Sequence, residues 1–138
     1  MRYTRLMNRV LEGKRILLVE SDALVREAVS LMLRALNMEV VSAKGGHEAL
    51  DLYLKQPFDA VVSDYRMNKM RGDELAKVIK SIDPHQRVIL ITGYVDEAMA
   101  SERAARYVDQ IVEKPCSLEQ LAEALSVPTQ LPDLAVRQ

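Results

Sequence analysis

Cysteine is almost absent from this sequence, and several other signals that assign a protein to a class are missing too. The only cysteine, Cys116, excludes an internal disulfide framework and a cysteine-based zinc cluster. Tryptophan is absent, and five tyrosines and one phenylalanine argue against a stacking surface for single-stranded nucleic acid. No apolar run approaches the ~18 residues of a membrane span. We therefore expect a cytoplasmic protein that binds neither nucleic acid nor membrane.

Charge of one sign is not in excess either. The sequence has 19 lysines and arginines against 20 aspartates and glutamates, a formal net charge of −1 at pH 7. Such a balanced chain has no strong field to attract nucleic acid or an anionic membrane. The start of the chain lacks a continuous apolar stretch, so it makes a poor signal peptide. The length of 138 residues suits one ordinary domain that buries its own core.

Short apolar runs of strand length alternate with helical patterns along the chain. The runs lie at residues 16–19, 38–41, 60–62 and 88–91, and a fifth strand is expected near 110–112. Between them, apolar residues recur every three or four positions, which predicts helices within 24–36, 49–54, 75–82, 97–106 and 118–125. Ser117 and Gln120 form a capping-box pattern at the start of the last helix. This order predicts a three-layer, doubly wound (βα)5 α/β fold with a five-stranded parallel sheet.

The pattern places one domain over residues 13–125. Residues 1–12 form an N-terminal extension, within which 2–11 are compatible with a short helix. Residues 126–138 form a C-terminal tail that carries two prolines and no sustained period. We expect the tail to be extended, irregularly docked or disordered.

Polar side chains gather where the expected strands end. The residues at these ends are acidic, hydroxyl-bearing or basic: Glu20, Ser21, Asp22, Asp64, Thr92 and Lys114. Because the carboxyl ends of parallel strands form the sites of open α/β sheets, we expect these side chains to meet at one rim. Carboxylates there can hold Mg²⁺, and a carboxylate beside a divalent metal can be the nucleophile in phosphoryl transfer. Asp22 alone also fits the N-cap of the following helix.

The segments around these residues resemble the receiver domain of two-component response regulators, the family that includes chemotaxis regulators. They read RILLVESDALVREAV, DAVVSDYRMNKMRGDELA, VILITGY and IVEKPCSLEQL. The resemblance covers residues 14 to about 125. It implies a flavodoxin-like fold with strand order 2-1-3-4-5. It also implies that a histidine kinase or phosphotransfer protein donates a phosphoryl group to Asp64.

The resemblance carries further roles onto matching positions. Thr92 would contact the phosphoryl oxygens and reorient on activation, and Lys114 would pair with the phosphoryl group. Mg²⁺ would be bound by Glu20, Asp64 and the backbone carbonyl of Arg66. The peptide bond between Lys114 and Pro115 would be cis. Such a domain is not an enzyme in its own right, beyond self-phosphorylation from a donor and slow autodephosphorylation.

Two departures from the family pattern bear directly on function. Ser21 stands where the family usually has a second acid that binds the metal directly. A neutral hydroxyl is a weaker ligand, so Ser21 is a doubtful member of the metal site and the pocket loses one negative charge. Ile111 stands where the family has its switch aromatic, three residues before the lysine. A rotamer switch of tyrosine or phenylalanine therefore cannot operate at that position.

Three functions remain open from the sequence. The first is a receiver that is phosphorylated on Asp64 and signals through a conformational shift. Its partners would be the kinase, which donates the phosphoryl group, and a downstream protein or fused output domain. The output partner would bind the surface of the fourth helix, fifth strand and fifth helix. A homodimer is a further option. The second is a pseudo-receiver that binds proteins without phosphorylation because of Ser21. The third is an unrelated aspartyl phosphotransferase or phosphatase, which commonly begins with an Asp-x-Asp-x-Thr run that Glu20 to Ala23 do not supply.

Overall fold

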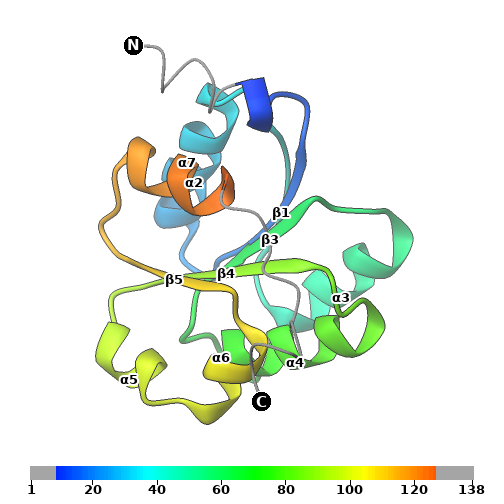
Figure 1. Ribbon diagram of the computed structural model, residues 1–138, viewed down its shortest axis with the longest axis vertical. Coiled ribbons are helices and arrows are strands. Elements are labelled where there is room, and N and C mark those ends of the chain that lie inside the picture. The colour runs from blue at the N-terminus through cyan, green and yellow to red at the C-terminus, as the bar shows by residue number, and fades with distance from the viewer. Residues whose placement is uncertain (1–8, 127–138) are drawn as a thin grey trace, which may run out of the picture.

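A five-stranded parallel sheet forms the centre of the computed structural model, which describes residues 9–126 (Figure 1). Its strands are β1 (Arg15–Val19), β2 (Glu39–Ala43), β3 (Ala60–Ser63), β4 (Arg87–Thr92) and β5 (Gln110–Glu113). They follow the order β2-β1-β3-β4-β5, and every neighbouring pair is parallel. The expected α/β class, strand number and 2-1-3-4-5 order are confirmed.

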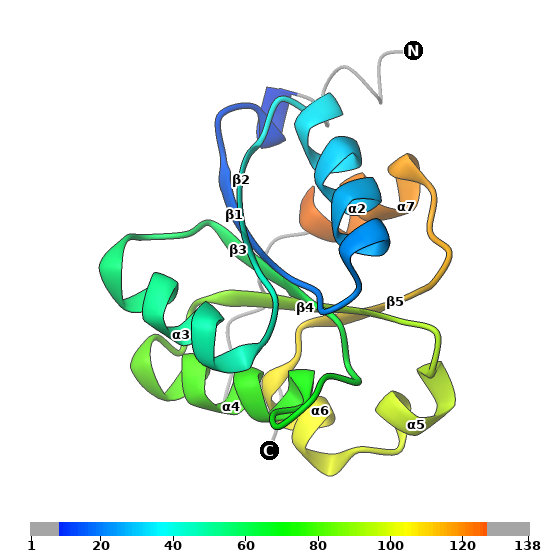
Figure 2. The same ribbon diagram turned by 180° about the vertical axis from the view of Figure 1, so that it is seen from behind.

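Helices cover both faces of this sheet. The helices are α2 (Ala23–Ala35), α3 (Gly46–Lys55), α4 (Gly72–Ile82), α5 (Val95–Met99), α6 (Glu102–Tyr107) and α7 (Leu118–Ser126). Figures 1 and 2 show α2 and α7 on one face and α3, α4 and α6 on the other. Within residues 9–126, no helix combines the length and the apolar character that a membrane crossing requires.

Two apolar layers hold the helices to the sheet. One layer joins α2 and α7 to the strands and includes Ile16, Leu18, Val62, Leu33 and Leu121. The other joins α3 and α4 to the strands and includes Leu17, Val61, Val88, Leu75 and Ile79. Successive strand residues point to opposite faces, so each strand feeds both layers. Burial on both faces explains why the inner strands β1, β3 and β4 are near-continuous apolar runs rather than alternating ones.

The expected helix over residues 97–106 was wrong, because the structure has two short helices there. α5 ends at Met99, and α6 begins after Ser101. The hydroxyl of Ser101 accepts a hydrogen bond from the N–H of Ala104 at 3.0 Å, which caps α6. A serine hydroxyl can bind a backbone N–H in this way and so compete with a continuous helix. The alanines and charged residues of this segment did not indicate the break.

The expected extension and tail fall largely outside the described residues. A turn of helix occupies residues 9–11, and Leu11 is buried in the layer below α2 and α7. At the other end, α7 continues through Ser126, the first residue of the expected tail. The helix expected over residues 2–11 is therefore described only in its last turn, and the tail only in its first residue.

Arg87 joins the start of β4 to the end of α7. Although it is charged, this side chain is buried. Its Nη2 and Nε donate to the carbonyl of Ala124 at 2.6 and 3.2 Å, and Nη2 also donates to Oε1 of Gln110 at 3.2 Å. A cation at the C-terminus of a helix complements the helix dipole. The last turn of α7 is thereby anchored to the sheet.

Gly72, the first residue of α4, packs directly against the loop after β3. Its N–H donates to the carbonyl of Tyr65 at 2.8 Å. A Cβ at this position would overlap the backbone carbonyl of Asp64 and lie 2.7 Å from Cδ2 of Leu90. Only glycine lets α4 begin this close to Asp64.

We expect Gly72→Ala to lower the free energy of unfolding by about 1–3 kcal/mol, the usual cost of overpacking a filled site. Gly45→Ala is the matched control, because a Cβ there meets nothing within 4 Å. Urea unfolding of both variants and the parent measures the two changes. Equal effects of the two substitutions would contradict the close packing at Gly72.

Candidate functional site

Backbone hydrogen bonds place the two acidic loops side by side at the carboxyl ends of β1 and β3. The N–H of Asp64 donates to the carbonyl of Val19 at 2.9 Å, and the N–H of Glu20 donates to that of Ala43 at 3.0 Å. Both bonds continue the parallel ladder just past the strands. β1 lies between β2 and β3, so the strand order reverses here, and open α/β sheets form their sites at such a point.

Glu20, Asp64 and Lys114 meet at this edge. Nζ of Lys114 lies 2.5 Å from Oε1 of Glu20 and 3.3 Å from Oδ2 of Asp64. The side chains of Glu20, Asp64 and Lys114 are 4%, 13% and 24% exposed, so the ammonium group bridges two largely buried carboxylates. These three side chains, expected to converge at one rim, are brought together in the structure.

Burial and mutual repulsion act on the protonation of this cluster. Burial raises the pKa of Asp64, and the charge of Glu20 raises it further. Lys114 lowers the pKa of Asp64 by its charge and hydrogen bonding, without cancelling the rise. Burial alone would lower the pKa of Lys114, but the hydrogen bond to Glu20 and the charge of Asp64 raise it above its ordinary value. The lysine is therefore held in its charged form.

Thr92 and Lys114 lie at the ends of the adjacent strands β4 and β5. The carbonyl of Thr92 accepts a hydrogen bond from the N–H of Lys114 at 2.9 Å. Thr92 is fully buried, and its Oγ1 accepts the N–H of Tyr94 at 2.9 Å. Its hydroxyl proton remains available as a donor. The peptide bond between Lys114 and Pro115 is cis.

Asp22 does not supply the acid that Ser21 lacks. Its Oδ1 accepts hydrogen bonds from the N–H groups of Leu24 and Val25 at 2.9 and 3.2 Å, so it caps α2 as expected. Ser21 is exposed and lines a cavity of about 340 Å³ together with Arg66 and Glu97. Within residues 9–126, no group of three histidine, cysteine, aspartate or glutamate side chains is arranged to hold a metal ion.

Two arginine side chains have partners that the sequence did not reveal. Nη2 and Nε of Arg66 donate to Oε2 of Glu97 at 2.5 and 3.1 Å, and its Cζ lies 3.8 Å from the ring centroid of Tyr94. Arg26 donates from Nη1 to the backbone carbonyl of Glu20 at 2.9 Å. Arg66 and Glu97 are 31 residues apart, so no local sequence pattern predicts their pairing. For Arg26, only the six-residue spacing from Glu20, which places Arg26 about one turn into α2, offered a signal.

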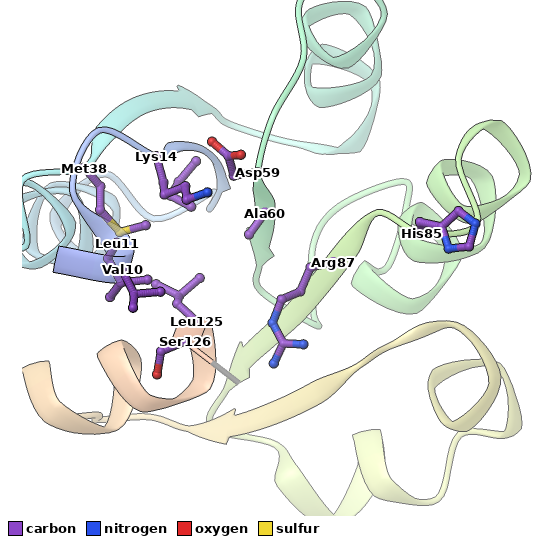
Figure 3. A pocket seen from close by; sticks show the side chains of 11 residues that line it. Val10, Leu11, Lys14, Met38, Asp59, Ala60, His85, Arg87, Leu125 and Ser126 are labelled. Carbon is purple, nitrogen blue, oxygen red and sulfur yellow. The ribbon is translucent and has the colours of Figure 1, made fainter. Parts of the chain in front are cut away.

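A second cavity lies at the opposite edge of the sheet and is not part of this site. It has a volume of about 230 Å³ and is lined by residues such as Met38, Ala60 and Arg87 (Figure 3). Ala60 and Arg87 begin β3 and β4, whereas Asp64 and Thr92 lie at the other ends of these strands.

Comparison with known sequences places the chain within a family. The model of the response regulator receiver domain matches residues 16–126. The chemotaxis protein CheY of Thermotoga maritima is 30% identical over 115 residues, which cover 83% of this chain and 96% of that protein. The receiver protein CpdR of Brucella abortus is 30% identical over 112 residues, covering 81% and 93%. Other relatives are longer: the chain spans 24% of the response regulator FleR of Pseudomonas aeruginosa, at 35% identity over 112 residues and 78% of this chain.

Solved structures share the same architecture. The chemotaxis protein CheY4 of Vibrio cholerae superposes with a TM-score of 0.76 at 27% identity, over 82% of this chain and 96% of that one. The response regulator TrrA of Thermotoga maritima, solved in complex with Mg²⁺ and BeF, gives a TM-score of 0.75 at 28% identity, over 80% and 94%. With the family model matched over most of its length, this chain belongs to the response regulator receiver domains of two-component signalling.

Proposed function

We propose that Asp64 accepts a phosphoryl group from a histidine kinase or phosphotransfer protein, and that the domain signals through the resulting conformational shift. One observation carries the proposal: the carboxylate of Asp64 lies at the site edge of the sheet, 3.3 Å from the ammonium group of Lys114. Receiver domains interact with histidine kinases and output domains. By analogy with that family, the donor would be a histidine kinase or phosphotransfer protein and the output would be a downstream protein or fused domain.

The reaction uses Asp64 as the nucleophile. One Oδ of its carboxylate attacks phosphorus, a new P–O bond forms, and the P–N bond of the donor phosphohistidine breaks with its electron pair returning to the imidazole. Lys114 offsets negative charge on the transferred phosphoryl oxygens. Thr92 can donate its hydroxyl proton to one of these oxygens. Although the pKa of Asp64 is raised, the side chain is the nucleophilic carboxylate at any pH above that pKa.

The donor atoms at the site fit Mg²⁺ in kind. The carboxylates of Glu20 and Asp64 and the backbone carbonyl of Arg66 are hard oxygen ligands, and Mg²⁺ is commonly held by one or two carboxylates and several waters. When bound, the metal ion would neutralise charge that develops on the phosphoryl oxygens. Ser21 adds only a neutral hydroxyl, and Lys114 already contacts both carboxylates. We therefore propose a weak magnesium site.

The same departure supports a second function. With two acids and one lysine at the site, the chain has less negative charge there than the family pattern supplies. A pseudo-receiver would keep the fold and bind its partner without phosphorylation. In both proposals the partner surface consists of α5, α6, β5 and α7, which correspond to the fourth helix, fifth strand and fifth helix of the family pattern. Phosphorylation and magnesium binding separate the two proposals.

The first test is phosphorylation from a small donor. After incubation with acetyl phosphate and Mg²⁺, the intact chain should gain the mass of one phosphoryl group, and Asp64→Asn should not. Asp59→Asn is the matched control, because Asp59 lies at the opposite end of β3. An adduct that survives in Asp64→Asn would move the acceptor elsewhere, and no adduct in the parent would favour the pseudo-receiver.

The second test restores the missing acid. Ser21→Asp places a third carboxylate beside Glu20 and Asp64, so Mg²⁺ should bind more tightly because affinity rises with ligand charge. Without metal, repulsion between the carboxylates should make Ser21→Asp less stable than the parent. Thermal melts in EDTA and in millimolar Mg²⁺ measure both effects. The gain from metal follows RT ln(1 + [L]/Kd), about 2.7 kcal/mol at a hundredfold excess over Kd.

Glu119→Asp provides a control for the melts, because it alters an exposed carboxylate in the first turn of α7 without changing its charge. Equal magnesium-dependent shifts in Ser21→Asp and the parent would mean that residue 21 is not at the metal position. The pseudo-receiver proposal would then lose its main support.

The third test uses the raised pKa of Asp64. A carboxyl whose pKa is higher in the folded than in the unfolded chain destabilises the fold above its folded pKa, and this cost disappears below its unfolded pKa. In metal-free solution at about pH 7, Asp64→Asn should therefore melt at a higher temperature than the parent. The difference should shrink as the pH falls toward about 3.9, the ordinary value for aspartate. A difference that is constant across this range would show that Asp64 titrates normally.

A further inference from the structure

Asp73 is a buried carboxylate that the chemistry at Asp64 does not use. It is the second residue of α4 and is 2% exposed. Its Oδ2 accepts the hydroxyl proton of Ser101 at 2.7 Å and lies 3.6 Å from Nη1 of Arg103. Its Oδ1 accepts the N–H of Glu74 at 2.9 Å. Because a buried carboxylate is costly without partners, these contacts hold Ser101 and Arg103 against α4.

Ser101 lies at the break between α5 and α6. Its Oγ accepts the N–H of Ala104 while its proton is donated to Asp73. The alanines and charged residues on both sides favour a continuous helix. The contact with Asp73 therefore accounts for a break at this residue. α6 packs against α4, as both views show (Figures 1 and 2).

On its N-terminal side, Asp73 is held close to Asp64, the proposed phosphoryl acceptor. Asp73 follows Gly72, which leaves no space for a Cβ beside the backbone carbonyl of Asp64. The N–H of Gly72 also binds the carbonyl of Tyr65 at 2.8 Å. The first turn of α4 must therefore follow any movement of the backbone at Asp64. A continuous path of contacts runs from Asp64 through Gly72 and Asp73 to Ser101.

We propose that Asp73 couples the loop of Asp64 to the helix pair α5–α6 and sets the point where that segment breaks. This is a positioning role, because Asp73 touches no reacting atom. It gives the chain a route to its partner surface that needs no aromatic residue at Ile111. The signalling meaning of this route rests on the proposed function, whereas the coupling itself is a property of the unphosphorylated chain.

An apolar contact offers a competing route. Tyr65, next to the acceptor, is buried in one cluster with Leu90, Ala98 and Ala104, and so also touches α5 and α6. This cluster does not include Asp73. A substitution that replaces the carboxylate of Asp73 by an apolar side chain of similar size separates the two routes.

The experiment measures amide chemical shifts in the full chain without metal or phosphoryl donor. Asp64→Asn is introduced into the parent, into Asp73→Leu and into Ser101→Ala. Ser101→Ala removes the same contact from the partner side, and it replaces Asp73→Leu if that variant fails to fold. The amides of Ala104 and Ala105 in α6 report the response. Asp73→Asn keeps an oxygen that can accept from Ser101, and Glu102→Gln removes an exposed carboxylate of α6 that does not contact Asp73.

Asp64→Asn should shift the α6 amides in the parent, in Asp73→Asn and in Glu102→Gln. The shift should fall at least about twofold in Asp73→Leu and Ser101→Ala, since coupled sites respond non-additively. Hydrogen exchange of the α6 amides should also become about tenfold faster in these two variants. Absence of a response in the parent, or a full response in Asp73→Leu or Ser101→Ala, would overturn the coupling. Neither result depends on whether Asp64 can be phosphorylated.

Discussion

Two buried carboxylates share one ammonium group in this molecule, and most of the site follows from that arrangement. Glu20 and Asp64 would repel each other at the sheet edge without Lys114, which contacts both. The parallel ladder brings the carboxylates together, and the end of β5 supplies the lysine. An acid at residue 21 would be a third carboxylate beside a single lysine and would increase the repulsion. Ser21 leaves two carboxylates for one lysine.

Much of the fold was predictable because its main determinants are local. The inner strands β1, β3 and β4 are buried on both faces and read as near-continuous apolar runs. All five strands lie within a residue or two of their expected bounds. Caps were also readable: Asp22 caps α2, and Ser117 and Gln120 exchange hydrogen bonds at the start of α7. The convergence of Glu20, Asp64 and Lys114 followed from one topological rule, because the ends of parallel strands share an edge.

The features that were missed depend on contacts between distant parts of the chain. The break at Ser101 depends on Asp73, a residue of another helix. The pairing of Arg66 with Glu97 and Tyr94 likewise joins the loop after β3 to the start of α5. A hydrophobic period cannot report such contacts, because polar side chains carry no period of their own. The site was thus predictable in its acids and its lysine, but not in the polar contacts that connect it to α5 and α6.

The anchor between Arg87 and the last turn of α7 has a consequence for local unfolding. Two hydrogen bonds from Arg87 tie that turn to β4, which lies inside the sheet between β3 and β5. Unwinding of the last turn of α7 would break both bonds and leave the buried guanidinium without its carbonyl partner. The end of α7 near Ala124 should therefore fray less readily than an ordinary helix end.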